Sequence, residues 1–180
     1  GYYPKHIDGH QHIHIIPKVA KLVAPIFHKY GVLSVRIPDE DVENYTWLSD
    51  ERYTRYQNRY IDAIKSRLIY KKYNIKAPEC FVGLGICGRD MTHDRIENAL
   101  KKSFGIVEVM THPGWVDKCI RNDIFDDDFD ISLERLAEHN QLDYFKDKKL
   151  ISWDVYSSTA HTSMLQSTVD TTLGIAHTAT

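Results

Sequence analysis

Hydrophobic and polar positions alternate at the start of the chain, where residues 6–14 read His-Ile-Asp-Gly-His-Gln-His-Ile-His. Side chains two positions apart share one face of a β-strand, which places His10, His12 and His14 together. Ile7 and Ile13 fall on the opposite face of the same segment. The pattern predicts a strand over residues 6–13, with an imidazole front and an apolar back.

Farther along the chain, helical and strand-like hydrophobic periods follow one another. The spacing of apolar residues predicts helices over residues 17–30, 51–73, 92–103 and 132–140, with Thr92 and Ser132 as N-caps. Short apolar runs predict strands over residues 32–37, 81–86, 107–110 and 150–155. Alternating strands and helices indicate an α/β fold with a mostly parallel sheet, either open or closed into a barrel.

The face of the long helix over residues 51–73 is predicted by its apolar stripe. Tyr56, Tyr60, Ile64 and Leu68 follow one another four residues apart, and we expect this stripe to pack against the core.

Residues 157–180 differ from the rest of the chain. They are rich in serine, threonine and alanine and show no convincing periodic pattern of apolar residues. Such a segment has little apolar surface to bury, so we expect a tail that is disordered or not native to the fold. The expected domain therefore covers residues 1–156.

Composition narrows the classes of protein that fit the chain. The 180 residues suffice for one domain, and the net charge of −2 without a long basic run argues against a nucleic-acid partner. No apolar stretch approaches the length of a membrane span, which argues against a membrane partner. Three cysteines without metal-site spacing suggest free thiols in a reducing compartment, and no signal peptide is visible, so we expect a cytoplasmic location.

Two histidine segments carry the chemistry that the residues suggest. Imidazole binds metals such as zinc and titrates near neutral pH, so the face with His10 and His12 favours a metal or acid–base site. His112 follows the predicted strand over residues 107–110, and Pro113 and Gly114 end that strand. The carboxyl ends of parallel strands are where α/β folds place their sites, although a loop histidine satisfied by the turn backbone fits this segment equally well.

These motifs resemble those of the YdjC family of carbohydrate deacetylases. The similarity covers residues 1 to about 155 and rests on segments 6–14, 35–38 (Val-Arg-Ile-Pro), 81–84 (Phe-Val-Gly-Leu), 108–114 (Glu-Val-Met-Thr-His-Pro-Gly) and 150–155 (Leu-Ile-Ser-Trp-Asp-Val). Three short segments are most similar to eukaryotic members of the family: Asp-Gly-His-Gln-His at residues 8–12, Thr-Trp-Leu at 46–48 and Cys-Gly-Arg at 87–89.

The resemblance implies a (β/α)-barrel-like fold and metal-dependent removal of acetyl groups from N-acetylated sugars such as chitooligosaccharides. In this family one aspartate and two histidines hold the metal, and the position of the second histidine is occupied here by His10. The resemblance favours magnesium as the divalent ion, while imidazole and oxygen ligands also suit zinc or manganese. An acetylated amino sugar is the expected substrate.

The sequence departs from the family in its metal ligands. It contains no Asp-Asp-Phe-Gly motif, and the first metal-binding histidine of the family is also missing. A complete barrel takes about 250 residues, so we expect the C-terminal portion of such a protein and only a partial barrel. A partial barrel leaves strand edges uncovered, and we expect an inactive chain that self-associates into a homo-oligomer.

The resemblance also suggests roles for individual side chains. His112 is the expected general acid or base, because the ordinary pKa of imidazole lies near working pH. Arg36 is expected to pair with a catalytic carboxylate or a sugar hydroxyl. His12 and Trp115 are candidates for contacts with the substrate, with plain packing as the alternative for Trp115. If His10 and His112 share one site, they should face a common cleft at one edge of the sheet.

Two other classes of function remain open at this point. A binding or scaffold protein could keep the fold without catalysis and still recognise carbohydrate. A metal-dependent phosphoesterase also uses clustered histidines with Asp-x-His, but the resemblance to deacetylases disfavours it.

Overall fold

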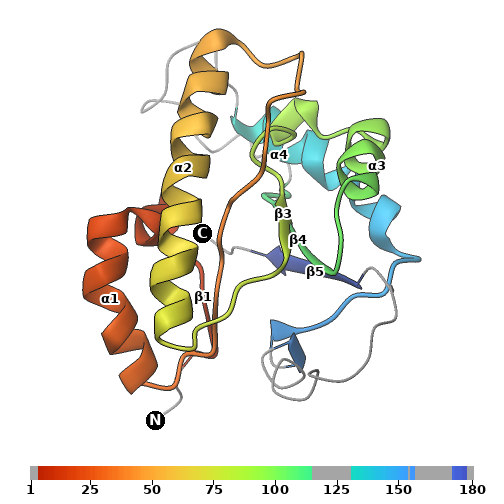
Figure 1. Cartoon of the computed structure of the whole chain (residues 1–180). Helices are drawn as coiled ribbons and strands as arrows, with labels where there is room; N and C mark the ends of the chain where they lie inside the picture. Colours follow the sequence, from red (N-terminus) through yellow and green to blue (C-terminus); the bar gives the residue numbers. More distant parts are fainter. Residues whose placement is uncertain (1–3, 115–130, 154, 157–171, 178–180) are drawn as a thin grey trace.

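The strands of the chain are short and parallel (Figure 1). The computed structural model describes residues 4–114, 131–153, 155–156 and 172–177. In this part, β1 (His6–Ile7) pairs with β2 (Ser34–Val35), and β4 (Ile106–Thr111) lies between β3 (Cys80–Val82) and β5 (Thr172–His177). Every described pairing is parallel, which confirms the expected mostly parallel α/β class.

The two sheets are linked by backbone hydrogen bonds between β2 and the segment that leads into β3. Ser34 forms an isolated parallel bridge with Lys76, and the Val35 amide donates to the Lys76 carbonyl at 2.8 Å. The strands therefore follow one another in chain order, as expected for successive β/α units. The expected barrel is not shown: the described strands form two short sheets, and no closed ring is present among them.

The helices lie close to the predicted ranges. The α-helices are α1 (Pro17–Lys29), α2 (Asp50–Lys72), α3 (His93–Lys101) and α4 (Ile131–His139), and the 3-10 helices are η1 (His10–Ile15), η2 (Gly88–Asp90) and η3 (Leu142–Phe145). The Thr92 hydroxyl accepts from the Arg95 amide, which confirms the predicted N-cap of α3. The other predicted cap is wrong, because Ser132 lies inside α4 and not before it.

Small residues allow α1 and α2 to pack side by side (Figure 1), in a core that also includes Val35 of β2. Ala20, Ala24 and Ala63 are fully buried in this contact, together with Tyr70 of α2. The stripe predicted for α2 is wrong in its second half, because Ile64 and Leu68 are 40% and 60% exposed. The helix buries a narrower face, built on residues seven apart at positions 56, 63 and 70. Ala63 and Tyr70 pack in the core shared with α1, whereas Tyr56 packs against Phe81 and Met110.

A second core fills the space between β3, β4 and the helices α3 and η3. Val107 and Val109 of β4 pack there against Ile96 of α3 and Phe145 of η3, all at most 1% exposed. This packing holds β4 in place, so that the residues just after its end have a defined position. None of the helices in the described residues is long and apolar enough to span a bilayer.

Two predicted strands and part of the tail differ from expectation. The predicted strand over residues 6–13 ends at Ile7, because η1 begins at His10 and the backbone at Gln11 and His12 has φ of 48° and 59°. The segment 150–155 has a single bridge residue and helical residues in place of a strand. Within the tail expected to be disordered, Thr172–His177 forms β5 beside β4, while the domain boundary at residue 156 stays a prediction.

Candidate functional site

The carboxyl ends of β1 to β4 surround one cavity of about 560 Å³. The residues that follow these strands contribute to its lining, among them His10 and His12 after β1, Arg36 after β2, Leu84 after β3 and His112 after β4. His10 and His112 therefore share one cavity at one edge of the strands, as the sequence predicted. The volume lies within the range usual for small-molecule sites.

The turn that carries the histidines is held by His14. The Gly9 amide donates to His14 Nδ1 at 3.0 Å, so the other ring nitrogen carries the proton and donates to the Arg36 carbonyl at 2.7 Å. A Cβ atom at residue 9 would lie 2.6 Å from His14 Nδ1, which explains the glycine. These contacts replace the predicted strand with a compact turn, and they separate the three histidines that a strand would have aligned.

His12 and His10 consequently have different surroundings. His12 is only 6% exposed, and burial lowers its pKa to about 3, helped by the nearby charge of Arg36. Its ring meets Phe81 edge to face, with 6.1 Å between the ring centres. His12 is thus a neutral imidazole at the cavity wall, whereas His10 is exposed at the start of η1.

Arg36 lies at the centre of a buried ionic cluster. Its Nε donates to Glu108 Oε1 and its Nη1 pairs with Asp8 Oδ2, both at 2.5 Å. Burial raises the pKa of Glu108 to about 7, although the Arg36 charge opposes this shift. Arg36 thus pairs with two carboxylates and orients Asp8 at the cavity wall, while its expected pairing with a catalytic carboxylate or a sugar hydroxyl stays a prediction.

His112 directly follows β4 and is held by a carboxylate from α4. The backbone amide of His112 donates to Glu138 Oε2, and the Gly88 amide donates to Glu138 Oε1 at 2.6 Å. The imidazole is 45% exposed, and its Nδ1 lies 3.7 Å from Glu138 Oε1. A buried carboxylate beside an accessible imidazole is an arrangement suited to proton transfer.

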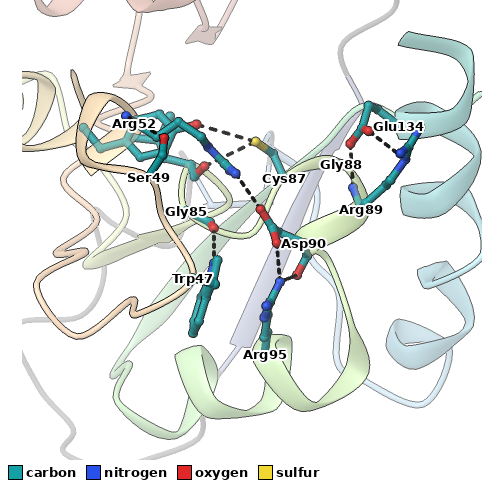
Figure 2. A network of polar contacts seen from close by, with 12 residues as sticks. Trp47, Ser49, Arg52, Gly85, Cys87, Gly88, Arg89, Asp90, Arg95 and Glu134 are labelled. Atoms are coloured by element: carbon teal, nitrogen blue, oxygen red, sulfur yellow. Dashed lines mark hydrogen bonds and ion pairs between the residues drawn. The ribbon is translucent and has the colours of Figure 1, made fainter. Parts of the chain in front are cut away.

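A second cavity of about 550 Å³ adjoins the first, and His112 lines both. Figure 2 shows the polar network beside it, in which Arg52 of α2 and Arg95 of α3 both pair with Asp90. The Trp47 indole donates to the Gly85 carbonyl at 2.9 Å, and Arg95 lies 4.3 Å from the Trp47 ring centre. Trp47 therefore has a packing role here, and the network joins the segments 46–48 and 87–89 singled out in the sequence.

Three buried carboxylates were missed by sequence reasoning: Glu40, Glu108 and Glu138. Glu40 Oε2 accepts from the consecutive amides of Gly83, Leu84 and Gly85, and so fixes the loop after β3. The position of Glu108 inside an otherwise apolar strand was the available signal, because an unpaired carboxylate there would be costly. The predicted substrate contact Trp115 lies outside the described residues.

A metal ion was expected at His10. Among the described residues, no group of three or more histidine, cysteine, aspartate or glutamate side chains is arranged to hold one. Catalytic metal sites generally use about three protein ligands, so the described residues do not fit a complete ion site.

Comparisons with known proteins find relatives that are named carbohydrate deacetylases. A "Carbohydrate deacetylase" of Xenopus laevis is 28% identical, with 77% of this chain and 51% of the relative covered. The Homo sapiens protein of the same name is 32% identical, with 64% of this chain and 38% of the relative covered.

The chain thus spans about half the length or less of these two relatives. No solved structure matches it significantly. The profile of the family described as "YdjC-like protein" matches residues 1–153, which confirms the family expected from the motifs. The chain therefore belongs to the YdjC-like protein family.

Proposed function

We propose that this chain supplies the sugar-binding and proton-transferring part of a deacetylase that acts on N-acetylated amino sugars of the chitooligosaccharide type. The observation that carries the proposal is the single cavity lined by His12, Arg36 and His112. It occurs in a chain whose relatives are named carbohydrate deacetylases. The proposal concerns the whole protein, because the match covers only 51% of the Xenopus laevis relative.

Hydrolysis of an acetamide adds water to the carbonyl carbon and breaks the bond from that carbon to nitrogen. The leaving amine needs a proton, because an amide anion is too unstable to depart. In the proposal, protonated His112 gives this proton to the nitrogen, and acetate and a free amino sugar are the products. Its half-exposed imidazole at the cavity is accessible to such a substrate.

His12 and Arg36 would bind and orient the sugar. His12 stays neutral well below neutral pH, so its imidazole can donate and accept a hydrogen bond with a hydroxyl or acetamide group. Arg36 is held by two carboxylates, and this rigid pairing keeps Asp8 in one orientation at the cavity wall. Fixed polar groups of this kind bind a sugar without a large entropic cost.

The divalent ion of the proposal, magnesium with zinc or manganese as alternatives, would polarise the carbonyl and activate water. Since the described residues do not form a three-ligand site, we propose that His10 contributes one ligand and that the others come from outside the described residues. We expect the 180-residue chain by itself to release no acetate.

Two measurements test the proposal. The first is the chemical-shift response of the ¹⁵N-labelled chain to diacetylchitobiose, compared with the deacetylated dimer; we expect shifts at Gly9, His12 and His112 with the acetylated sugar only. The His112→Ala variant is measured in the same way. His28→Ala is its matched control, because His28 is exposed on α1. Absence of any shift at the cavity would contradict the sugar-binding role.

The second measurement is acetate release, with added magnesium or zinc, by a fusion of this chain to the unmatched half of the Xenopus laevis relative. We expect turnover by the fusion, and His112→Ala should lower it by about 10²–10⁴-fold because a proton donor is lost. Acetate release by the 180-residue chain alone would show that the site is complete without the fusion partner.

A non-catalytic carbohydrate-binding protein is the second candidate. The lack of a three-ligand group among the described residues favours it. Sugar binding together with an inactive fusion would support this candidate over the deacetylase.

A further inference from the structure

Glu138 is a buried carboxylate to which neither the sequence motifs nor the proposed chemistry gives a role. It lies on α4, is 2% exposed, and faces the residues at the end of β4. We propose that Glu138 is the positioning residue of His112, holding the imidazole with its proton on Nδ1 so that Nε2 exchanges the proton with substrate. The inference rests on the proposed function in one respect, the use of His112 for proton transfer.

Glu138 Oε1 lies 3.7 Å from His112 Nδ1, while Glu138 Oε2 accepts from the backbone amide of the same residue. A single carboxylate thus accepts a hydrogen bond from the backbone of His112 and also faces its ring. A carboxylate accepts hydrogen bonds and cannot donate them, so the neighbouring ring nitrogen is favoured in its protonated form.

The Glu138 carboxylate is itself held in place by two hydrogen bonds. The Gly88 amide of η2 donates to Glu138 Oε1 at 2.6 Å, so two backbone donors fix its plane. Gly88 has φ of 65°, a left-handed conformation that turns its amide toward α4 at little cost. Because the carboxylate is anchored in this way, the imidazole orients to suit the carboxylate, and the carboxylate does not reorient to suit the imidazole.

The distance of 3.7 Å is longer than a hydrogen bond, which is common for catalytic pairs before substrate binds. Since the His112 backbone is anchored to the same carboxylate, a small rotation of the ring would bring Nδ1 into hydrogen-bond range. After Nε2 has given its proton to the leaving amine, the ring is neutral and still carries the proton on Nδ1. The protons therefore balance within the step.

Glu134 provides a matched control one turn earlier on the same helix. Its carboxylate also accepts from a backbone amide, that of Arg89 at 2.7 Å, and pairs with the Arg89 guanidinium at 2.9 Å (Figure 2). It has the same chemistry and a similar backbone contact, but its partner is Arg89 and not His112. A merely structural role for α4 carboxylates would make the two positions equivalent.

The test is the tautomer of His112 in the 180-residue chain, read from its ring ¹⁵N chemical shifts at a pH where the imidazole is neutral. We expect the Nδ1–H form in the unmodified chain. Glu138→Gln keeps the size and an acceptor oxygen but loses the charge, and it should shift His112 to the Nε2–H form that free imidazole prefers. Glu134→Gln should leave the tautomer unchanged.

Three results would overturn the inference: an Nε2–H tautomer in the unmodified chain, an unchanged tautomer in Glu138→Gln, or an equal change in Glu134→Gln. If Glu138→Gln does not fold, the tautomer of the unmodified chain still decides. No substrate or metal is needed, so failure of acetate release in the fusion leaves this test unaffected, and the two proposals fail separately.

Discussion

Replacing Arg36 by methionine removes the cation that pairs with both Glu108 and Asp8, while much of the buried aliphatic volume is kept. Glu108 is fully buried, so its carboxylate would be left in the core without this partner. Breaking a buried ion pair in this way costs about 3–5 kcal/mol, a large part of the 5–15 kcal/mol that stabilises a typical domain. We therefore expect Arg36→Met to lower the free energy of unfolding by about 3–5 kcal/mol at pH 8.

The loss should shrink at lower pH. Burial raises the pKa of Glu108 to about 7, above its ordinary value of 4.5, so the folded state binds a proton there that the unfolded state does not. Stability from this group therefore rises as pH falls from about 7 towards 4.5. Without the Arg36 charge the pKa of Glu108 rises further, because that charge opposes the shift. At pH 5.5 the carboxyl of the variant is neutral, and only lost packing and hydrogen bonds remain, about 1–2 kcal/mol.

The assay is urea unfolding followed by circular dichroism at pH 5.5 and pH 8, for the variant and the unmodified chain. Arg55→Met is the control, because Arg55 pairs with Glu51 on the exposed face of α2 and should cost less than about 0.5 kcal/mol at both pH values. Arg36→Met combined with Glu108→Leu should recover most of the loss, since the fully buried carboxylate is removed together with its partner and Asp8 is partly exposed to water. A loss below about 1 kcal/mol at pH 8, or equal losses at both pH values, would refute this reasoning.

Two further predictions concern β1 and the turn that follows it. His6 is stacked on Trp153 at 3.5 Å, and burial lowers its pKa to about 3, so the unfolded state alone gains a proton as pH falls below about 6.5. His6→Gln should therefore flatten the loss of stability towards acid pH in urea unfolding, and an unchanged slope would contradict the burial argument. Gly9→Ala places a Cβ 2.6 Å from His14 Nδ1 and should cost about 1–3 kcal/mol, measured as a lower melting temperature; an unchanged melting temperature would show that the turn can relax.

Local sequence was sufficient to predict the helices and the central strand. Helix α1 begins at Pro17 because proline at the first turn loses no hydrogen bond, and α3 begins after the capping side chain of Thr92. The apolar run of β4 and the Pro-Gly turn after it placed His112 at a strand end. These features depend on residues only a few positions apart, so a periodic pattern in the sequence is enough to predict them.

Only the tertiary structure decided the conformation of the histidine segment. Its alternating pattern is also compatible with a strand. The observed turn makes two hydrogen bonds that a strand could not make, one from the Gly9 amide to His14 and one from His14 to the Arg36 carbonyl. The second of these joins residues from different β/α units. A local pattern carries no information about such a partner, so it could not exclude the strand.

The carboxylates of the site depended on tertiary structure for the same reason. Glu108 lies 72 residues from Arg36, and Glu138 lies 26 residues from His112, yet each pair is in contact. In the sequence Glu108 interrupts an apolar strand and Glu138 resembles any charged helix residue. The sequence by itself was enough to predict that the two histidine segments and Arg36 belong to one site. The packing of α4 and β4 decided which carboxylates hold them, because a buried charge finds its partner through space and not along the chain.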